Sequence, residues 1–252
     1  MAWGARSLDW AHLAEISARD VYLHVLDETS VQRGVSVLDI ACGAGLALAM
    51  AASRGARVAG IDASERLLAV AKCRTPDADL RRGDMRNLPW PENSFDVITS
   101  FNGVWATNQD VIHEAARVLR PKGRLALAFF ANGGQLDFLV PLITLTALMP
   151  AAEGQENASL LDIARPGVAE DMLDHAGLTA THRGRARATA EWPTADIAWR
   201  AVAATGLTSA VLAQHAEEEV RTAVQDALAD FWDPNCGYRL VTEYDFVISS
   251  PT

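Results

Sequence analysis

A glycine-containing junction between a predicted strand and a predicted helix most constrains the fold of this chain. The β-prone run at residues 37–40 leads to Gly43 and Gly45, and then to the helix-forming residues 46–52. Glycine suits such a turn because it tolerates positive φ and, without a Cβ, lets a ligand lie against the main chain beside a helix N-terminus. The stretch therefore predicts a strand, a tight turn and a helix that together bind a small molecule.

The residues around this turn restrict the kind of ligand. A dinucleotide-binding fingerprint would place glycine or alanine where Leu48 stands, and the chain contains no P-loop phosphate motif. Asp39, inside the strand, would repel a phosphate but attract an ammonium or a sulfonium. Asp62 follows the next apolar run, 56–61, at about the twenty-residue offset of a ribose-binding carboxylate. The pattern favours a cationic nucleoside ligand.

Predicted strands and helices alternate from residue 35 onward. Such alternation predicts a doubly wound α/β fold, in which helices cover both faces of a parallel sheet. Ligands of these sheets bind beyond the carboxyl ends of the strands, where Asp39, Asp62, Asp84 and residues 100–102 fall. Four loops are therefore expected to converge on one crevice. The expected strands are 35–40, 56–61, 78–82, 94–100 and 123–130, with helices near 44–54, 64–74 and 109–120.

Four runs of sequence stand in a characteristic order and spacing: VLDIACGAG at 37–45, GIDAS at 60–64, GDMRNLPWPENSFDVITS at 83–100 and EAARVLRPKGRLAL at 114–127. They resemble the motifs of the class I S-adenosylmethionine (SAM)-dependent methyltransferases, and most closely the small-molecule branch that includes the ubiquinone and menaquinone methylating enzymes. The resemblance is strong over about 35–131. It implies a Rossmann-like, seven-stranded, mostly parallel sheet with an antiparallel last strand and a helical cap.

The same resemblance implies a role for residues along the crevice. Asp39 would orient the methionine moiety through its ammonium group, and Asp62 would accept hydrogen bonds from both ribose hydroxyls. Asp84 would contact the adenine amine, with Met85 near the ring. Helix capping is the alternative for the two strand-end acids, and packing is the alternative for Met85. The full predicted set for SAM, and for its product S-adenosylhomocysteine (SAH), is Asp39, Ala41, Cys42, Gly43, Gly45, Asp62, Ala63, Asp84, Met85 and Phe101.

The acceptor side is expected to follow the fourth strand. Asn102 and Trp105 would contact the substrate, and the absence there of the D/N-P-P-Y/F signature counts against methylation of nucleic-acid bases. A hydroxyl acceptor would need a general base, for which His12 and His24 are the candidates. A surface or structural role remains the alternative for both histidines. Apolar side chains in the cap indicate an apolar or aromatic acceptor such as a quinone, a polyketide or another secondary metabolite.

The pattern, taken with the family resemblance, implies three regions of the chain. Residues 1–34 would form a helical arm over the cofactor site, 35–131 the SAM-binding core, and 132–252 the rest of the sheet. Insertions at about 135–165 and 194–232 would form the cap. Strands are expected at about 178–187 and 238–249, and the family resemblance implies that they close the sheet as an antiparallel pair.

Composition excludes several other classes. A net charge of −10 argues against nucleic acid as a partner. The cysteines at 42, 73 and 236 form no C-x-x-C pair and, with no paired acidic or histidine cluster, predict no metal site and a reducing cytoplasm. The N-terminus lacks the apolar core of a signal peptide, and the longest apolar run, 138–150, is too short to span a bilayer. We therefore expect a cytoplasmic enzyme that acts on a small molecule, of no specified oligomeric state.

Two other functions remain open from the sequence. A SAM-binding chain could catalyse a cyclisation or another reaction without methyl transfer, because the cofactor motifs do not fix the chemistry above them. A nicotinamide oxidoreductase is disfavoured by Asp39 and by the missing third glycine.

Overall fold

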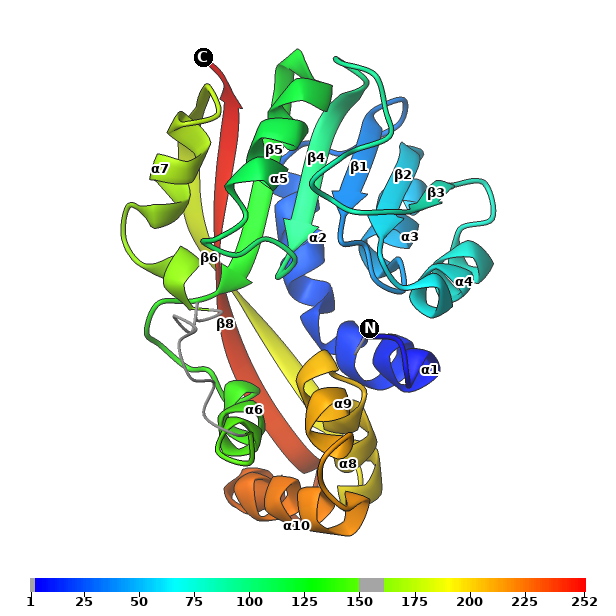
Figure 1. Ribbon diagram of the computed structural model, residues 1–252, viewed down its shortest axis with the longest axis vertical. Helices are drawn as coiled ribbons and strands as arrows, with labels where there is room; N and C mark the ends of the chain where they lie inside the picture. Colours follow the sequence, from blue (N-terminus) through cyan, green and yellow to red (C-terminus); the bar gives the residue numbers. More distant parts are fainter. Residues whose placement is uncertain (1–2, 150–160) are drawn as a thin grey trace.

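The computed structural model describes residues 3–149 and 161–252 (Figure 1). Their strands are β1 (Ser36–Ile40), β2 (Arg57–Asp62), β3 (Asp79–Arg82), β4 (Phe95–Phe101), β5 (Leu119–Phe130), β6 (Leu178–Trp192), β7 (Trp232–Asp233) and β8 (Gly237–Pro251). They form one sheet in the order β3-β2-β1-β4-β5-β8-β6, with β7 paired to β8 outside this path. Strands β1 to β5 are parallel, whereas β8 is antiparallel to both β5 and β6. The expected mixed sheet is confirmed, and the two-residue β7 is an additional strand.

Helices cover both faces of the parallel strands. They are α2 (Arg19–Glu28), α3 (Leu46–Ser53), α4 (Glu65–Arg74), α5 (Gln109–Val118) and α7 (Val168–Asp174). Neighbouring residues of a strand point to opposite faces. Val37 of β1 packs with residues of α2 and α3, and the next residue, Leu38, packs with residues of α5 and α7. All five residues of β1 are buried, as expected for a parallel strand covered on both sides.

Strands β6 and β8 continue as a two-stranded ribbon beyond the rest of the sheet (Figure 1). The far end of this ribbon carries α6 (Leu139–Thr146), α8 (Ala195–Ala203), α9 (Gly206–Leu212) and α10 (Glu217–Leu228). Strand β6 extends past its predicted end at residue 187 and reaches Trp192, which is buried in the core that these helices form. Residues 150–160 of the expected insertion 135–165 lie outside the described part of the chain. Among the described residues, no helix has the length and apolarity needed to cross a membrane.

The N-terminal arm is helical, as the sequence predicts. It consists of α1 (Ser7–Asp9), the π-helical η1 (Trp10–Ala14), the 3-10 helix η2 (Glu15–Ala18) and α2. Trp192 of β6 donates a hydrogen bond from its indole nitrogen to the Leu13 carbonyl, and Arg200 of α8 forms an ion pair with Asp9. The arm therefore runs from the ribbon and its helices to the carboxyl end of the parallel strands.

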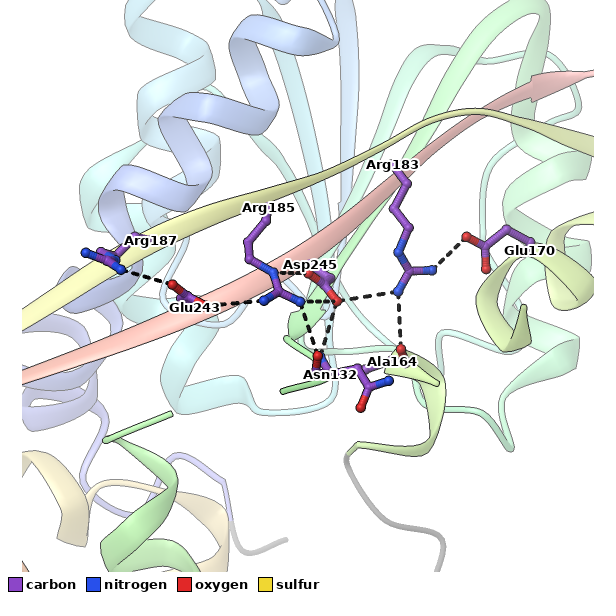
Figure 2. A network of polar contacts seen from close by, with 8 residues as sticks. All are labelled: Asn132, Ala164, Glu170, Arg183, Arg185, Arg187, Glu243 and Asp245. Atoms are coloured by element: carbon purple, nitrogen blue, oxygen red, sulfur yellow. Dashed lines mark hydrogen bonds and ion pairs between the residues drawn. The ribbon is translucent and has the colours of Figure 1, made fainter. Parts of the chain in front are cut away.

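A polar network lies on one face of the ribbon (Figure 2). Alternate residues of a strand share a face, so Arg183, Arg185 and Arg187 of β6 lie side by side. Directly opposite on β8, Asp245 pairs with Arg185 at 2.7 Å and Glu243 pairs with Arg187 at 3.1 Å. These five residues are called the arginine network below. Arg185 also donates a hydrogen bond to the main-chain carbonyl of Asn132, and Arg183 donates one to that of Ala164. These bonds hold both ends of the segment between β5 and α7.

Candidate cofactor site

The turn after β1 exposes main chain at the carboxyl end of the sheet. Ala41, Gly43 and Gly45 have φ angles of 58°, 55° and 77°. A Cβ on Gly45 would lie 2.7 Å from the Cβ of Ala71 in α4, so this position requires glycine for space as well as for conformation. Gly45 caps α3, whose N-terminus therefore faces the same crevice as the turn.

Cys42 packs against the core. Its sulfur would lie 2.8 Å from a Cβ added at Gly60, and the side chain is buried. Burial raises the pKa of the Cys42 thiol well above its ordinary value, with the nearby acids Asp39 and Asp62 adding to the effect. A thiol in this state is not a nucleophile at neutral pH, which agrees with a packing role.

Asp39 is a buried carboxylate near the end of β1. Only 3% of the residue is exposed, and the Thr99 hydroxyl donates a hydrogen bond to its Oδ1 at 2.7 Å. Burial raises the pKa of Asp39 to about 8, while the Thr99 hydrogen bond opposes that shift and the charges of Glu15 and Asp62 add to it. At pH 7 most of this group is therefore protonated, and a nearby cation would favour its charged form.

Asp62 lies at the end of β2 and holds the turn in place. It accepts hydrogen bonds from the main-chain nitrogens of Gly43, at 2.9 Å, and Ser64, at 2.8 Å. Burial nevertheless raises the pKa of Asp62 above its ordinary value. Ser64, and not Asp62, caps α4 by accepting a hydrogen bond from the nitrogen of Leu67. Ala63 lies between Asp62 and Ser64 in the chain.

The arm brings a third carboxylate to this place, which the sequence did not reveal. Glu15 is 4% exposed, and its carboxylate contacts Arg74 of α4. Burial raises the pKa of Glu15 despite the opposing effect of Arg74. A single acid in an amphipathic arm reads as a surface charge, so only its tertiary position identifies Glu15 as part of the site.

These elements enclose a small cavity of about 40 Å³. That volume is far below the roughly 300 to 1,000 Å³ of small-molecule sites, because the arm lies across the crevice. Five of the predicted cofactor residues line it together with four additional residues: Asp39, Ala41, Cys42, Gly43 and Phe101, with Trp10, Glu15, Tyr22 and Ala47.

The predicted adenine contacts lie outside this cavity. Asp84 follows β3, is exposed, and forms hydrogen bonds with Arg86 at 2.6 and 3.0 Å. The Arg86 side chain is the main reason that the pKa of Asp84 is lowered to about 2. Met85 is partly buried against the core beneath α5. Their contact with adenine stays a prediction.

The predicted acceptor and base residues are spread over a wider region. Asn102 follows β4 with a φ of 54° and hydrogen-bonds the Tyr244 side chain, while Trp105 is exposed. His12 and His24 are exposed and do not line the cavity; the ring of His24 packs against Phe246, with 5.2 Å between ring centroids. Catalysis by either histidine therefore stays a prediction. Among the described residues, no cluster of acids, histidines and cysteines is suited to hold a metal ion.

The chain is similar in sequence to known methyltransferases. The model of a methyltransferase domain matches residues 38–127. Demethylmenaquinone methyltransferase of Beutenbergia cavernae is 30% identical over 202 residues, which cover 78% of this chain and 79% of that protein. The enzyme of the same name from Paenarthrobacter aurescens is 38% identical over 110 residues, which cover 43% of this chain and only 44% of the relative.

A solved structure shares the fold at lower identity. The crystal structure of the cyclase SpnF aligns with a TM-score of 0.57 and 19% identity, covering 93% of this chain and 82% of that chain. The match to the Beutenbergia cavernae enzyme extends well beyond the domain match at 38–127, to most of both chains. The chain belongs to the class I SAM-dependent methyltransferases.

Proposed function

We propose that this enzyme transfers the methyl group of SAM to a small apolar or aromatic acceptor by in-line displacement. The observation that carries the proposal is that Asp39 and Glu15 line the cavity while Asp62 accepts a hydrogen bond from the lining residue Gly43, and that each of these acids has a raised pKa. Such a group of acids is poorly suited to phosphate and well suited to a ligand with ammonium and sulfonium charges. SAM supplies both charges and an activated methyl group.

The residues present fit this cofactor chemically. Asp39 would attract the ammonium group, and Asp62 would accept hydrogen bonds from ribose hydroxyls. Trp10 has a buried indole nitrogen without a hydrogen-bond partner in the described structure, which is a further sign that the crevice receives a polar ligand. Asp84 and Met85 are proposed for the adenine end.

The aromatic residues beside the cavity would exclude water from the reacting groups. Tyr22 of the arm packs on Phe101 of β4, with 4.3 Å between ring centroids. Burial, with the charge of Glu15 added, raises the pKa of Tyr22 well above its ordinary value, so its hydroxyl stays protonated. Catalysis would then depend mainly on alignment of acceptor, methyl carbon and sulfur.

An apolar or aromatic acceptor is supported by two observations. The relatives named demethylmenaquinone methyltransferase act, by that name, on a quinone-type molecule. The arm and the helices on the ribbon are rich in apolar residues, and we propose that they enclose the acceptor. Trp192 and Trp199, however, are buried inside the helical core, so the acceptor wall must come from other residues. Asn102 and Trp105 are proposed as two of them.

Titration calorimetry at pH 7 with SAM, SAH and NADH tests the cofactor assignment. Because the pKa of Asp39 is about 8, a bound cation should lower it and release a proton. The apparent binding enthalpy of SAM should therefore change with the ionisation enthalpy of the buffer. Binding of NADH instead of SAM would contradict the proposal.

Methyl transfer is tested with methyl-labelled SAM and a panel of reduced quinones and phenols. We expect label in a quinone-type or phenolic product, together with formation of SAH. Conversion of an acceptor while SAM stays intact would contradict methyl transfer and favour a SAM-organised cyclisation.

A further inference from the structure

Glu15 occupies a place lined by hydrogen-bond donors. Its carboxylate contacts the Arg74 guanidinium and accepts a hydrogen bond from the nitrogen of Leu46, the first residue of α3, at 3.5 Å. Arg74 is fixed there by two further bonds, to the carbonyls of Ala44 at 3.0 Å and Ala11 at 2.6 Å. The guanidinium therefore joins the arm, the glycine turn and α4 at one point.

A third donor faces the same point. A Cβ added at Gly43 would lie 3.4 Å both from Oε1 of Glu15 and from Nε1 of Trp10. The Trp10 nitrogen is buried and lacks a partner in the described structure, so one donor beside Glu15 is unused. A guanidinium, an indole N–H and a main-chain N–H at a helix start can only donate, and together they suit a carboxylate.

Asp39 lines the same cavity as Glu15, and the charge of Glu15 contributes to the raised pKa of Asp39. The methionine moiety of SAM carries an ammonium and a carboxylate on one carbon atom. If Asp39 attracts the ammonium, the carboxylate must lie within a few ångströms of it, and the donors around Glu15 are at that distance from the glycine turn. While Glu15 stays in place, its own carboxylate occupies the donors that the methionine carboxylate would need.

We propose that Arg74, the Leu46 N–H and the Trp10 indole form the subsite for the methionine carboxylate of SAM, and that Glu15 fills this subsite as an internal substitute that the cofactor displaces. The proposal rests on SAM as cofactor but not on the acceptor or on the transfer reaction. Arg74 is thus a binding residue, and Glu15 is a competitor carried by the arm.

Two ligands separate this role from a general effect on the site. SAH has the carboxylate, whereas S-adenosyl-3-thiopropylamine keeps the ammonium and lacks the carboxylate. Replacing Glu15→Gln removes the competing charge with little change in shape, so SAH should bind about tenfold more tightly. The amine should bind no more tightly than to the wild type, since it does not use the subsite.

Replacing Arg74→Gln should weaken SAH binding about tenfold or more and change binding of the amine by less than about twofold. Lys72→Gln is the matched control because Lys72 lies in the same helical turn, carries the same charge, and hydrogen-bonds outward to the Pro76 carbonyl. This control should leave both affinities unchanged.

Hydrogen exchange of the wild-type protein tests the displacement without a substitution. Peptides that cover 10–18 should lose protection when SAH binds and keep it when the amine binds. Weaker binding of SAH to Glu15→Gln would overturn the proposal, because Glu15 would then hold the ammonium. Equal losses for both ligands in Arg74→Gln would also overturn it. If wild-type protein binds neither SAM nor SAH, the cofactor assignment itself fails.

Discussion

Two groups of carboxylates in this protein have opposite electrostatic surroundings. At the cofactor site, burial raises the pKa values of Asp39, Asp62 and Glu15. In the arginine network on the ribbon, hydrogen bonds and charges of neighbouring arginines hold the pKa values of Asp245 and Glu243 below their ordinary range (Figure 2). Four of these acids lie on strands of one sheet and Glu15 lies on the arm, so the two groups differ in what surrounds them.

Burial alone does not explain the difference. Asp39 is 3% exposed and Asp245 is 5% exposed, yet their pKa values shift in opposite directions. Asp245 receives bonds from two arginines, at 2.7 and 3.5 Å, whereas Asp39 receives one from the neutral hydroxyl of Thr99. In the network each acid has an arginine partner within the chain. Asp39 has no cationic partner among the described residues, which is a property expected of a group that binds a cationic ligand.

The largest expected effect comes from Asp39→Asn. The pKa of Asp39 in the native state, about 8, is above the unfolded value of 3.8, so the native state binds more protons between these values. Stability due to this group is full below pH 4 and is lost as pH rises toward 8. Asparagine does not ionise, so the variant should have a free energy of unfolding at pH 8 that is higher by on the order of 3 kcal/mol. The same change should greatly weaken SAM binding.

Denaturant unfolding at pH 4 and pH 8 measures the first effect, and calorimetry measures the second. The gain in stability should be much smaller at pH 4. A variant that is less stable than wild type at pH 8 would show that Asp39 is a structural acid like those of the network.

The same substitution in the network should act in the opposite direction. Asp245→Asn leaves Arg183 paired only with Glu170 and Arg185 paired only with Glu243, and should lower the free energy of unfolding at pH 7 by about 2 kcal/mol. Since the native pKa of Asp245 is lowered, its stabilising effect is present above pH 4 and disappears as pH falls through that pKa. Thermal and denaturant unfolding check the result.

Glu191→Gln is the matched control for Asp245→Asn. Glu191 also pairs with an arginine across β6 and β8, Arg239, but at 3.6 Å and with both side chains 60% exposed. This exposed pair should contribute less than about 0.5 kcal/mol. An equal loss of unfolding free energy in both variants would mean that burial of the network adds nothing to stability. SAM affinity should stay unchanged in each variant.

The contrast also explains what the sequence could predict. Apolar runs and glycines predicted where strands β1 to β5 lie along the chain, and they predicted the turn at 41–45. Both depend on local residue type, through the alternation of strands with helices and through positive φ. Asp39 and Asp62 were expected at one end of the sheet because parallel strands bring their carboxyl ends together, and their contacts with the cofactor stay predictions. The antiparallel closing strands were expected through the family resemblance and are confirmed.

Tertiary partners were beyond that kind of reasoning. Glu15 meets Arg74 across 59 residues of chain, and Asp245 meets Arg185 across 60, with no local pattern that links either pair. The extension of β6 to Trp192 likewise depends on packing against helices that follow it in the sequence. Strand and turn positions can thus be predicted from the sequence, whereas the partners that set a carboxylate's pKa cannot.

The smallest expected effect comes from Thr99→Val, which leaves Asp39 in place but removes its hydrogen-bond donor. Because that hydrogen bond favours the charged carboxylate, its loss should raise the pKa of Asp39 further and weaken SAM binding by about 1 kcal/mol. The pH at which SAM binding reaches half its maximum should therefore move upward, as calorimetry across pH 6 to 9 can measure. Ser249→Ala is the control, since it removes a buried hydroxyl that donates to the Leu125 carbonyl, away from the site. An unchanged pH profile in Thr99→Val would mean that burial alone sets the charge of Asp39, and that the hydroxyl serves only to pack β1 against β4.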